Sequence, residues 1–344
     1  GAITLSGATW TLNASYTQNT GASLTMTSTT TWDMNDRASQ ASLPGNLTLS
    51  GGTLTAASLT TLNLEGSLNN SGNLLPNNLA VTLTADNTAD DATLTCGTVT
   101  FSSVSFSKTN YDANLTIGSD CTIPLGSSPT SSGGVITNNG AITLSGATWT
   151  LNASYTQNTG ASLTMTGTTT WDMNDRASTA SQPGNLTLSG GTLTASSLTT
   201  LNVQGNLDNT GNLLPNSLAL TLDGGDTGDD STLTCGTATF SSVTINKTNA
   251  GGLTVLASSC TSTGALTRTD GVVSNPASSY TLTVQGDFSM STTDAFGGAN
   301  LTVALTGGNT QAISQNAANT FSSPLQINKS GNSASLSTNL TTTT

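Results

Sequence analysis

The strongest constraint on this chain is that it repeats itself. Residues 1–39 return almost unchanged at 140–178, and the same offset of 139 positions continues as far as Cys121 and Cys260. Near-identity over such a length indicates a tandem array, in which each unit contacts mainly its neighbours. The sequence therefore divides into a first repeat unit at 1–139, a second at 140–264 and a divergent partial third at 265–344.

A shorter and looser module is nested inside this long repeat. The segment 61–110 has a copy at 200–249 and a more distant version from Tyr280 onward. All three versions share a strand that ends in glycine, a Thr-rich strand, the letters T-F-S-S and a lysine followed by Thr or Ser. Three versions of one pattern indicate a structural module.

Apolar and polar residues alternate within the modules, which predicts β-strands with one buried face. Gly and Asn separate these strands and predict turns. A coil of about 22 residues would stack equivalent apolar pairs, so we expect an all-β, elongated, parallel β-helix-like solenoid with coils of about 20–25 residues. The expected pairs are Ile3 with Leu24, Trp10 with Trp32, Leu24 with Leu47, and Trp32 with Leu54.

A string of small β-sandwich domains is the rival architecture. Such domains need about 100 residues and a large aromatic core. The short module here spans about 65–70 residues, and the whole chain has four Trp. The solenoid is therefore the favoured prediction.

The four cysteines lie in two equivalent pairs. Cys96 and Cys121 are separated by the same 25 residues as Cys235 and Cys260, and the chain has no His. Adjacent coils would bring each pair into range, so we expect two disulfides and an oxidising extracellular environment. Four free thiols in a reducing compartment are the alternative.

Composition narrows the possible partners. The chain carries 18 acidic and 6 basic residues for a net charge of -12, and no basic patch that could neutralise phosphates. No apolar run is long enough to cross a membrane. We therefore expect neither nucleic-acid binding nor membrane insertion of this segment. Gly1 falls in mid-pattern and no signal peptide is visible, which predicts a mature or excised piece of a longer protein.

The strand with L-T-V-x-L-T-G-G-x-x-Q-x-I, followed by T-F-S-S and I-N-K-S, resembles the β-strand repeats of very large bacterial surface and secreted proteins. Residues 280–330 match best, and 61–121 and 200–260 match more loosely. This resemblance implies the shaft of an adhesin or surface fibre at the bacterial cell surface. It also implies that binding tips lie elsewhere in the parent protein.

Catalysis is not expected. Enzymes on β-helices need clustered carboxylates or basic groups that hold an acidic sugar, whereas the six basic residues here are spread one or two per module.

Acidic turns are a weak candidate for a metal site, because carboxylates on Gly-rich turns can bind Ca²⁺. Solvated turns are the alternative, and no other cofactor is expected. The candidate Ca²⁺ ligands are Asp223, Asp226, Asp229 and Asp230, and similar turns carry Asp86, Asp90, Asp91 and the WDMND motif at 32–36.

Three further features have simple interpretations. Lys108, Lys247 and Lys329 occupy one place in the three modules, and we expect solvated lysines at strand ends. Thr-x-Thr runs are scattered over the chain, and sequons such as those at Asn46 and Asn114 are expected by chance in this composition. Another sequon lies at Asn185.

Together these observations predict a structural stalk or fibre segment. Its expected partners are further repeats of the same protein or identical subunits placed end to end, and surface glycans. The alternative is a solenoid that binds carbohydrate or ice on a Thr-rich face.

Overall fold

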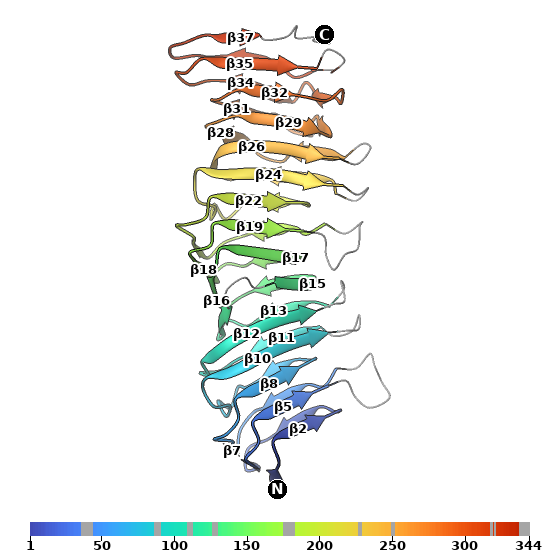
Figure 1. Ribbon diagram of the computed structural model, residues 1–344, viewed down its shortest axis with the longest axis vertical. Helices are drawn as coiled ribbons and strands as arrows, with labels where there is room; N and C mark the ends of the chain where they lie inside the picture. The colour runs from blue at the N-terminus through green and yellow to red at the C-terminus, as the bar shows by residue number, and fades with distance from the viewer. Residues whose placement is uncertain are drawn as a thin grey trace. The chain divides into compact units, whose positions relative to one another are not determined.

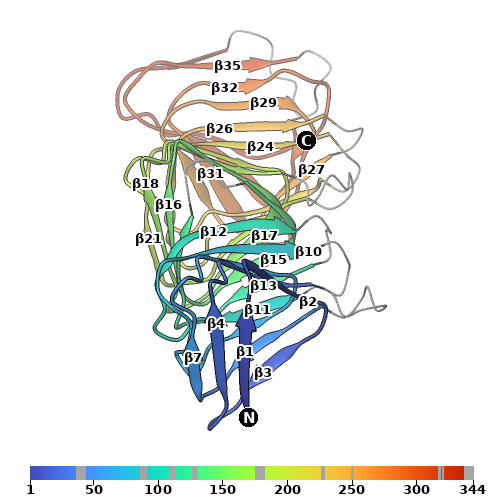
Figure 2. The ribbon, with the colours of Figure 1, turned by 60° about the horizontal axis from the view of Figure 1, so that its bottom comes forward.

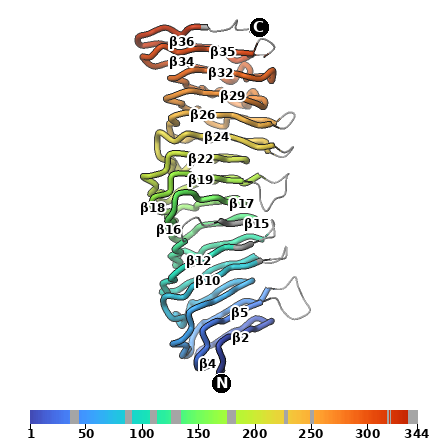
Figure 3. Tube along the Cα trace, in the orientation of Figure 1, coloured from blue at the N-terminus to red at the C-terminus, as the bar shows by residue number. Residues whose placement is uncertain are grey.

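The computed structural model describes residues 1–35, 44–85, 91–108, 113–125, 130–174, 183–225, 229–248, 252–316, 319 and 321–336. This part of the chain contains strands and turns but no helix, and it winds as a β-solenoid. Figure 1 labels the strands, and Figure 3 follows the coils along the Cα trace. The all-β solenoid expected from the repeats is confirmed.

The solenoid divides into two compact units. One holds Gly1–Thr168 and Gly191–Ala195, and the other holds Ser196–Thr344 with residues 169–174 and 183–190. The repeat units with boundaries at residues 139 and 264 were defined by sequence similarity. The two compact units are defined by contacts between residues, so they do not test these boundaries, which stay predictions.

The strands of the first unit are β1 (Ala2–Ser6), β2 (Thr9–Leu12), β3 (Tyr16–Gln18), β4 (Ser23–Thr27), β5 (Thr31–Met34), β6 (Leu47–Leu49), β7 (Thr53–Thr55), β8 (Thr61–Leu64), β9 (Leu68–Asn69), β10 (Leu79–Ala85), β11 (Ala92–Thr95), β12 (Phe101–Lys108), β13 (Leu115–Ile117), β14 (Thr122–Leu125), β15 (Thr130–Asn138), β16 (Ala141–Ser145), β17 (Thr148–Gln157), β18 (Ser162–Thr166) and β21 (Thr192–Thr194).

The strands of the second unit are β19 (Thr170–Met173), β20 (Leu186–Leu188), β22 (Thr200–Val203), β23 (Leu207–Asp208), β24 (Leu218–Gly224), β25 (Ser231–Thr234), β26 (Thr239–Lys247), β27 (Leu253–Leu256), β28 (Cys260–Ser262), β29 (Leu266–Asp270), β30 (Val272–Ser274), β31 (Tyr280–Val284), β32 (Phe288–Met290), β33 (Phe296–Gly297), β34 (Leu301–Leu305), β35 (Gln311–Gln315), β36 (Leu325–Ile327) and β37 (Ala334–Leu336).

Strands pair with the equivalent strands of the coils before and after them. In the first unit β1 pairs with β4 and β4 with β7, all parallel, and Figure 2 shows these three strands on one face. In the second unit the parallel column β28, β31, β34 and β36 has the same form. In a parallel ladder, both edges of each inner strand form hydrogen bonds. The backbone N–H and C=O groups of an inner strand are therefore paired with the strands of the two neighbouring coils.

The expected register is right for the first coil and wrong for the second. Ile3 lies opposite Leu24, and Trp10 lies opposite Trp32, 22 residues on, as predicted. Leu24 pairs with Leu54 instead of Leu47, and Trp32 pairs with Leu62 instead of Leu54. The cause is a longer coil of 30 residues, whose extra length falls between β5 and β6. The extra residues between β5 and β6 lengthen this coil, and β5 still pairs in register with β2 and β8.

Alternation along the strands fills the solenoid with apolar side chains. In β5, Trp32 and Met34 are fully buried, whereas Asp33 between them reaches the surface. Neighbouring coils approach closely at their turns, where Gly52 has φ +93° and a Cβ would meet the carbonyl oxygen of Ala22. Gly191 repeats this contact with Ala161. Only glycine fits such a turn, because other residues disfavour this φ and lack the space.

Candidate functional site

Two disulfides join successive coils. Cys96, which follows β11, is bonded to Cys121, which precedes β14, and their Cα atoms are 4.9 Å apart. Cys235 and Cys260 form the equivalent bond in the second unit, with Cα atoms 5.5 Å apart. The pairing agrees with the prediction from the 25-residue spacing. Each bond closes a loop of about one coil and contributes on the order of 3 kcal/mol to the free energy of unfolding.

A buried asparagine supports each disulfide, and sequence reasoning missed it. The Asn70 side chain is fully buried, and its Nδ2 donates to the carbonyl oxygen of Cys96 at 2.9 Å. Its Oδ1 accepts the backbone N–H groups of Leu74 and Leu75. Asn209 makes the same set of bonds around Cys235. The signal in the sequence was the retention of N-x-G-N-L-L-P in both copies, beginning at Asn70 and at Asn209.

The acidic turns use carboxylates to connect coils. Asp91 Oδ1 accepts the backbone N–H of Asn114 at 2.7 Å, and its counterpart Asp230 accepts that of Leu253 at 2.8 Å. Asp86, Asp90 and Asp226 lie outside the described residues. Asp91 and Asp230 thus each supply an acceptor to a backbone N–H of the next coil, which accounts for their place in the sequence.

The predicted Ca²⁺ ligands do not form a metal site among the described residues. Asp229 is buried, Asp230 is exposed and bonded as above, and no group of three or more His, Cys, Asp or Glu side chains is placed to share an ion in this part of the chain. Burial raises the pKa of the Asp223 carboxyl, and the nearby Lys247 ammonium partly offsets that rise. The structure therefore adds no support to the Ca²⁺ hypothesis.

The expectation of solvated lysines is wrong at Lys247. Its side chain is fully buried, and its Nζ donates to the backbone carbonyl oxygens of Gln204 and Asp223, both at 2.5 Å. Lys329 is half-buried and donates to the carbonyl oxygens of Thr306 and Asn309. Both ammonium groups donate hydrogen bonds to carbonyl oxygens of earlier coils. These bonds make the burial of the charge possible, because a buried charge is tolerated only when it is hydrogen-bonded. The Lys108 side chain lies outside the described residues.

Arg268 is a second buried cation that the sequence did not mark. It is fully buried in the second unit, and its guanidinium donates to the carbonyl oxygens of Gly271, Thr292, Asp294 and Ala295. Burial lowers the pKa of this guanidinium, while the carboxylates of Asp294 and Asp270 act in the opposite direction. Four carbonyl partners from two turns make Arg268 a connector between coils.

Outward polar residues form short ladders between coils. Asp33 accepts hydrogen bonds from Thr11 and Asn63 in the coils before and after it. Asp36, the last residue of the WDMND motif, lies outside the described residues. The sequon asparagines serve the same purpose: the Oδ1 atoms of Asn46, Asn114 and Asn185 accept backbone N–H groups of the following coil.

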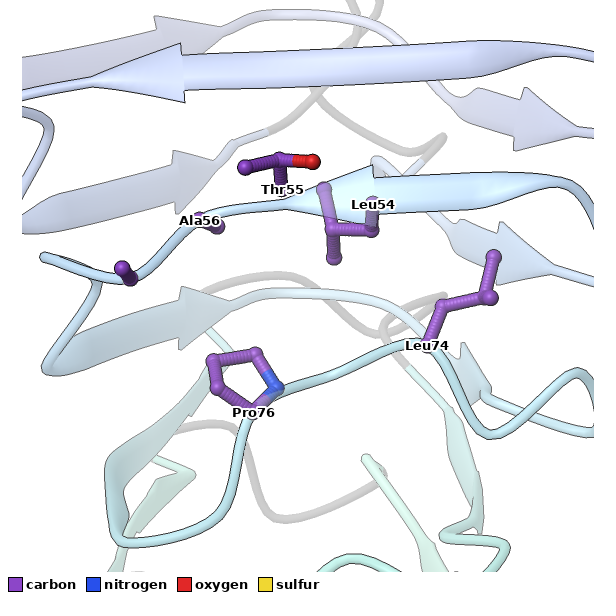
Figure 4. Close-up of a pocket in the computed structure, with 6 residues that line it drawn as sticks. Leu54, Thr55, Ala56, Leu74 and Pro76 are labelled. Carbon is purple, nitrogen blue, oxygen red and sulfur yellow. The ribbon is translucent and has the colours of Figure 1, made fainter.

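A shallow groove lies on the surface of the first unit beside β7, the last strand of sheet β1–β4–β7. It has a volume of about 320 Å³ and is lined by Leu54, Thr55, Ala56, Ala57, Leu74 and Pro76 (Figure 4). Binding sites for small molecules combine an apolar lining with a few convergent polar groups. Thr55 supplies the only side-chain hydroxyl of this lining, so the groove offers little for specific recognition.

No protein-family model, no curated protein and no solved structure matches the chain. Among the described residues there is also no helix that could span a membrane. Inference about function therefore depends on the fold and on the sequence itself.

Proposed function

We propose that this chain is a structural segment, a stalk or fibre shaft, of an extracellular bacterial surface protein and that it has no catalytic role. The observation that carries the proposal is that polar side chains which could form a site instead form hydrogen bonds between coils. Asp91, Asp230, Lys247 and Arg268 all bond to backbone groups of neighbouring coils or turns. Such side chains stabilise the shaft and leave few groups to act on a substrate.

Two further observations support an extracellular location. The pair of disulfides requires an oxidising compartment to form and persist. The chain also has 6 Lys and Arg residues in total, and two of them, Lys247 and Arg268, are fully buried, which leaves few sites for trypsin-like proteases. The resemblance to β-strand repeats of large bacterial surface proteins agrees with both.

Thiol trapping in the source organism tests the location. Cells are lysed in N-ethylmaleimide, and the mass of the full chain is measured with and without prior reduction. An exported protein gains no label until it is reduced and then gains four, because all four cysteines are paired. Labelling without reduction would contradict the proposal. Antibodies against the chain should also label intact cells before permeabilisation.

Ice or carbohydrate binding on a Thr-rich face is the second candidate function. It is favoured by a column in which Thr4, Thr25 and Thr55 lie opposite one another on the outer face of β1, β4 and β7. The column ends there, because sheet β1–β4–β7 has three strands. Replacing Thr25 with Val should abolish any thermal hysteresis, and an oxidised chain without hysteresis would eliminate the ice-binding form of this candidate.

A further inference from the structure

Strand β7 lies well inside the chain and has an open edge. β1, β4 and β7 form a parallel sheet of three strands, and among the described residues β7 pairs with β4 alone. One coil further on, residues 70–78 form turns between β9 and β10 and contain no strand. The structure describes the chain without a gap from residue 44 to residue 85, so the sheet ends at β7 because the next coil lacks the corresponding strand.

The register shows which backbone groups point to this open edge. The N–H of Thr53 donates to the carbonyl oxygen of Ala22 in the preceding coil. In a parallel ladder, successive residues direct their N–H and C=O groups to opposite sides of the strand. Leu54 therefore points both groups away from β4, and neither has a hydrogen-bond partner in the described part of the chain. The edge thus carries an unused donor and an unused acceptor.

The turn that faces β7 directs its own donors elsewhere. The N–H groups of Leu74 and Leu75 both donate to Oδ1 of the buried Asn70, and Pro76 has no N–H. Figure 4 shows Leu54 on one side of the groove and Leu74 and Pro76 on the other. The groove is therefore bounded by uncharged side chains and by an unpaired strand edge.

The second copy of the module has an equivalent open edge. β21 pairs with β18 alone among the described residues, and the N–H of Thr192 donates to the carbonyl oxygen of Ala161. Leu193 takes the place of Leu54, and its N–H and C=O groups also point away from the preceding strand. The N-x-G-N-L-L-P segment follows β21 at the same distance in sequence as it follows β7. The open edge is therefore a property of the repeated module.

We propose that the open edges of β7 and β21 bind extended peptide segments of partner proteins by strand addition. The added backbone accepts from the N–H of Leu54 and donates to its C=O, and one apolar side chain of the peptide enters the groove beside β7. A peptide fits this surface because the unused donor and acceptor have the spacing of a strand edge, whereas the lining side chains carry no charge. The inference goes beyond the stalk proposal, because it assigns a binding surface to the interior of the segment.

Fluorescence polarisation of a labelled peptide tests the proposal. The probe is residues 22–28, ASLTMTS, with blocked ends, because this sequence contains β4, which already forms a ladder with the other edge of β7. Strand addition depends mainly on backbone bonds, so this probe should bind the oxidised full chain saturably below about 500 µM. Two peptides should bind per chain, one at each open edge.

The double variant Leu54→Pro, Leu193→Pro locates the binding site. Proline removes the N–H that points to the open edge and leaves the ladder bonds of Thr53 and Thr192 in place. This variant should bind the probe at least about tenfold more weakly, and each single variant should keep one site. The control is Leu54→Ala, Leu193→Ala, which shortens the same side chains, keeps both N–H groups and should retain most of the affinity. Circular dichroism and thiol counting check that every variant folds.

Two methylated probes distinguish strand addition from binding through side chains alone. N-methyl groups on alternate peptide nitrogens block one edge of the probe and leave its side chains unchanged. Of two probes methylated on opposite edges, one should bind like the parent peptide and the other should not. The proposal is overturned if the parent probe does not bind saturably, if the double proline variant keeps full affinity, or if the two methylated probes bind equally. Thiol trapping measures the location separately, so either hypothesis can fail without the other.

Discussion

Residues 1–18 and 140–157 have the same sequence and lie in different surroundings. Ile3 is 46% exposed and Trp10 is half-buried, whereas Ile142 and Trp149 are each 1% exposed. The second copy has β14 and β15 paired beside it, and the first has no such coil in the described residues. In a solenoid, burial is therefore decided by the neighbouring coil as much as by the pattern of a strand.

The neighbouring coil also changes the secondary structure. In the first copy, Thr9–Leu12 and Tyr16–Gln18 are separate strands, β2 and β3. In the second copy the same residues form one continuous strand, β17, which pairs with β15 over most of its length. Identical sequence thus gives a longer strand where a partner supplies the hydrogen bonds.

The largest difference between the copies is expected at tryptophan. Trp149→Ala should lower the free energy of unfolding by about 3–5 kcal/mol, because the buried indole leaves a cavity. Trp10→Ala should cost about 1–2 kcal/mol, since part of this ring is already in water. Urea titration of the oxidised variants measures both. Equal costs would show that Trp10 is covered in solution as completely as Trp149.

The disulfide beneath the second copy provides the next test. Replacing both Cys96 and Cys121 with Ser should destabilise the coils that cover β16 by about 3 kcal/mol. Hydrogen exchange should then become faster in β16 and β17 but stay unchanged in β1, which this disulfide does not cover. The control is the Cys235→Ser, Cys260→Ser pair, which should leave β16 protected. Faster exchange in β1 would show that the coils open together.

Tyrosine ionisation distinguishes the copies by pH. Burial raises the pKa of both Tyr16 and Tyr155, and the effect is much larger at the fully buried Tyr155, where a hydrogen bond from Asn138 opposes it only partly. Above the ordinary pKa of about 10, the unfolded chain loses a proton that folded Tyr155 retains, so stability falls by up to about 1.4 kcal/mol per pH unit.

Absorbance at 295 nm and unfolding between pH 9 and 11.5 measure this effect. Tyr155→Phe should make the decline with pH shallower, whereas Tyr16→Phe should change it less. The hypothesis is wrong if the two variants lose the same amount of stability over this range.

The smallest effects are expected where both copies of a residue make the same hydrogen bond. Asp91→Ala and Asp230→Ala each remove one acceptor of a backbone N–H from the next coil. Each should cost about 1 kcal/mol. Thermal unfolding of the two variants should agree within error. A marked inequality would mean that the two modules differ in ways beyond the covering coil.

Repetition and alternation were enough to predict the fold class and the disulfides. The 139-residue offset, the alternating apolar residues and the cysteine spacing all describe local chemistry that any solenoid must satisfy. The constant coil length was wrong after β5, because a periodicity that assumes equal coils cannot reveal extra residues between two strands. The register of Trp32 with Leu62 required the structure.

The candidate site was predicted less well. A strand-end lysine is usually solvated, yet Lys247 turns inward because carbonyl groups of Gln204 and Asp223 converge there. Asn70 looked like an ordinary turn residue and proved to be a buried support of the disulfide. In both cases the partners are backbone atoms of other coils, and the side-chain pattern of the sequence does not reveal where those atoms lie.

The sequence by itself determined that this chain is a repeated, all-β solenoid with paired cysteines, because these properties follow from the identity and spacing of side chains. Only the tertiary structure decided which residues are covered. Ile3 and Ile142 have the same local sequence, and the stacked coil beside one of them removes it from water. Burial depends on the coil that is stacked beside a residue, so the sequence of a single coil does not determine it.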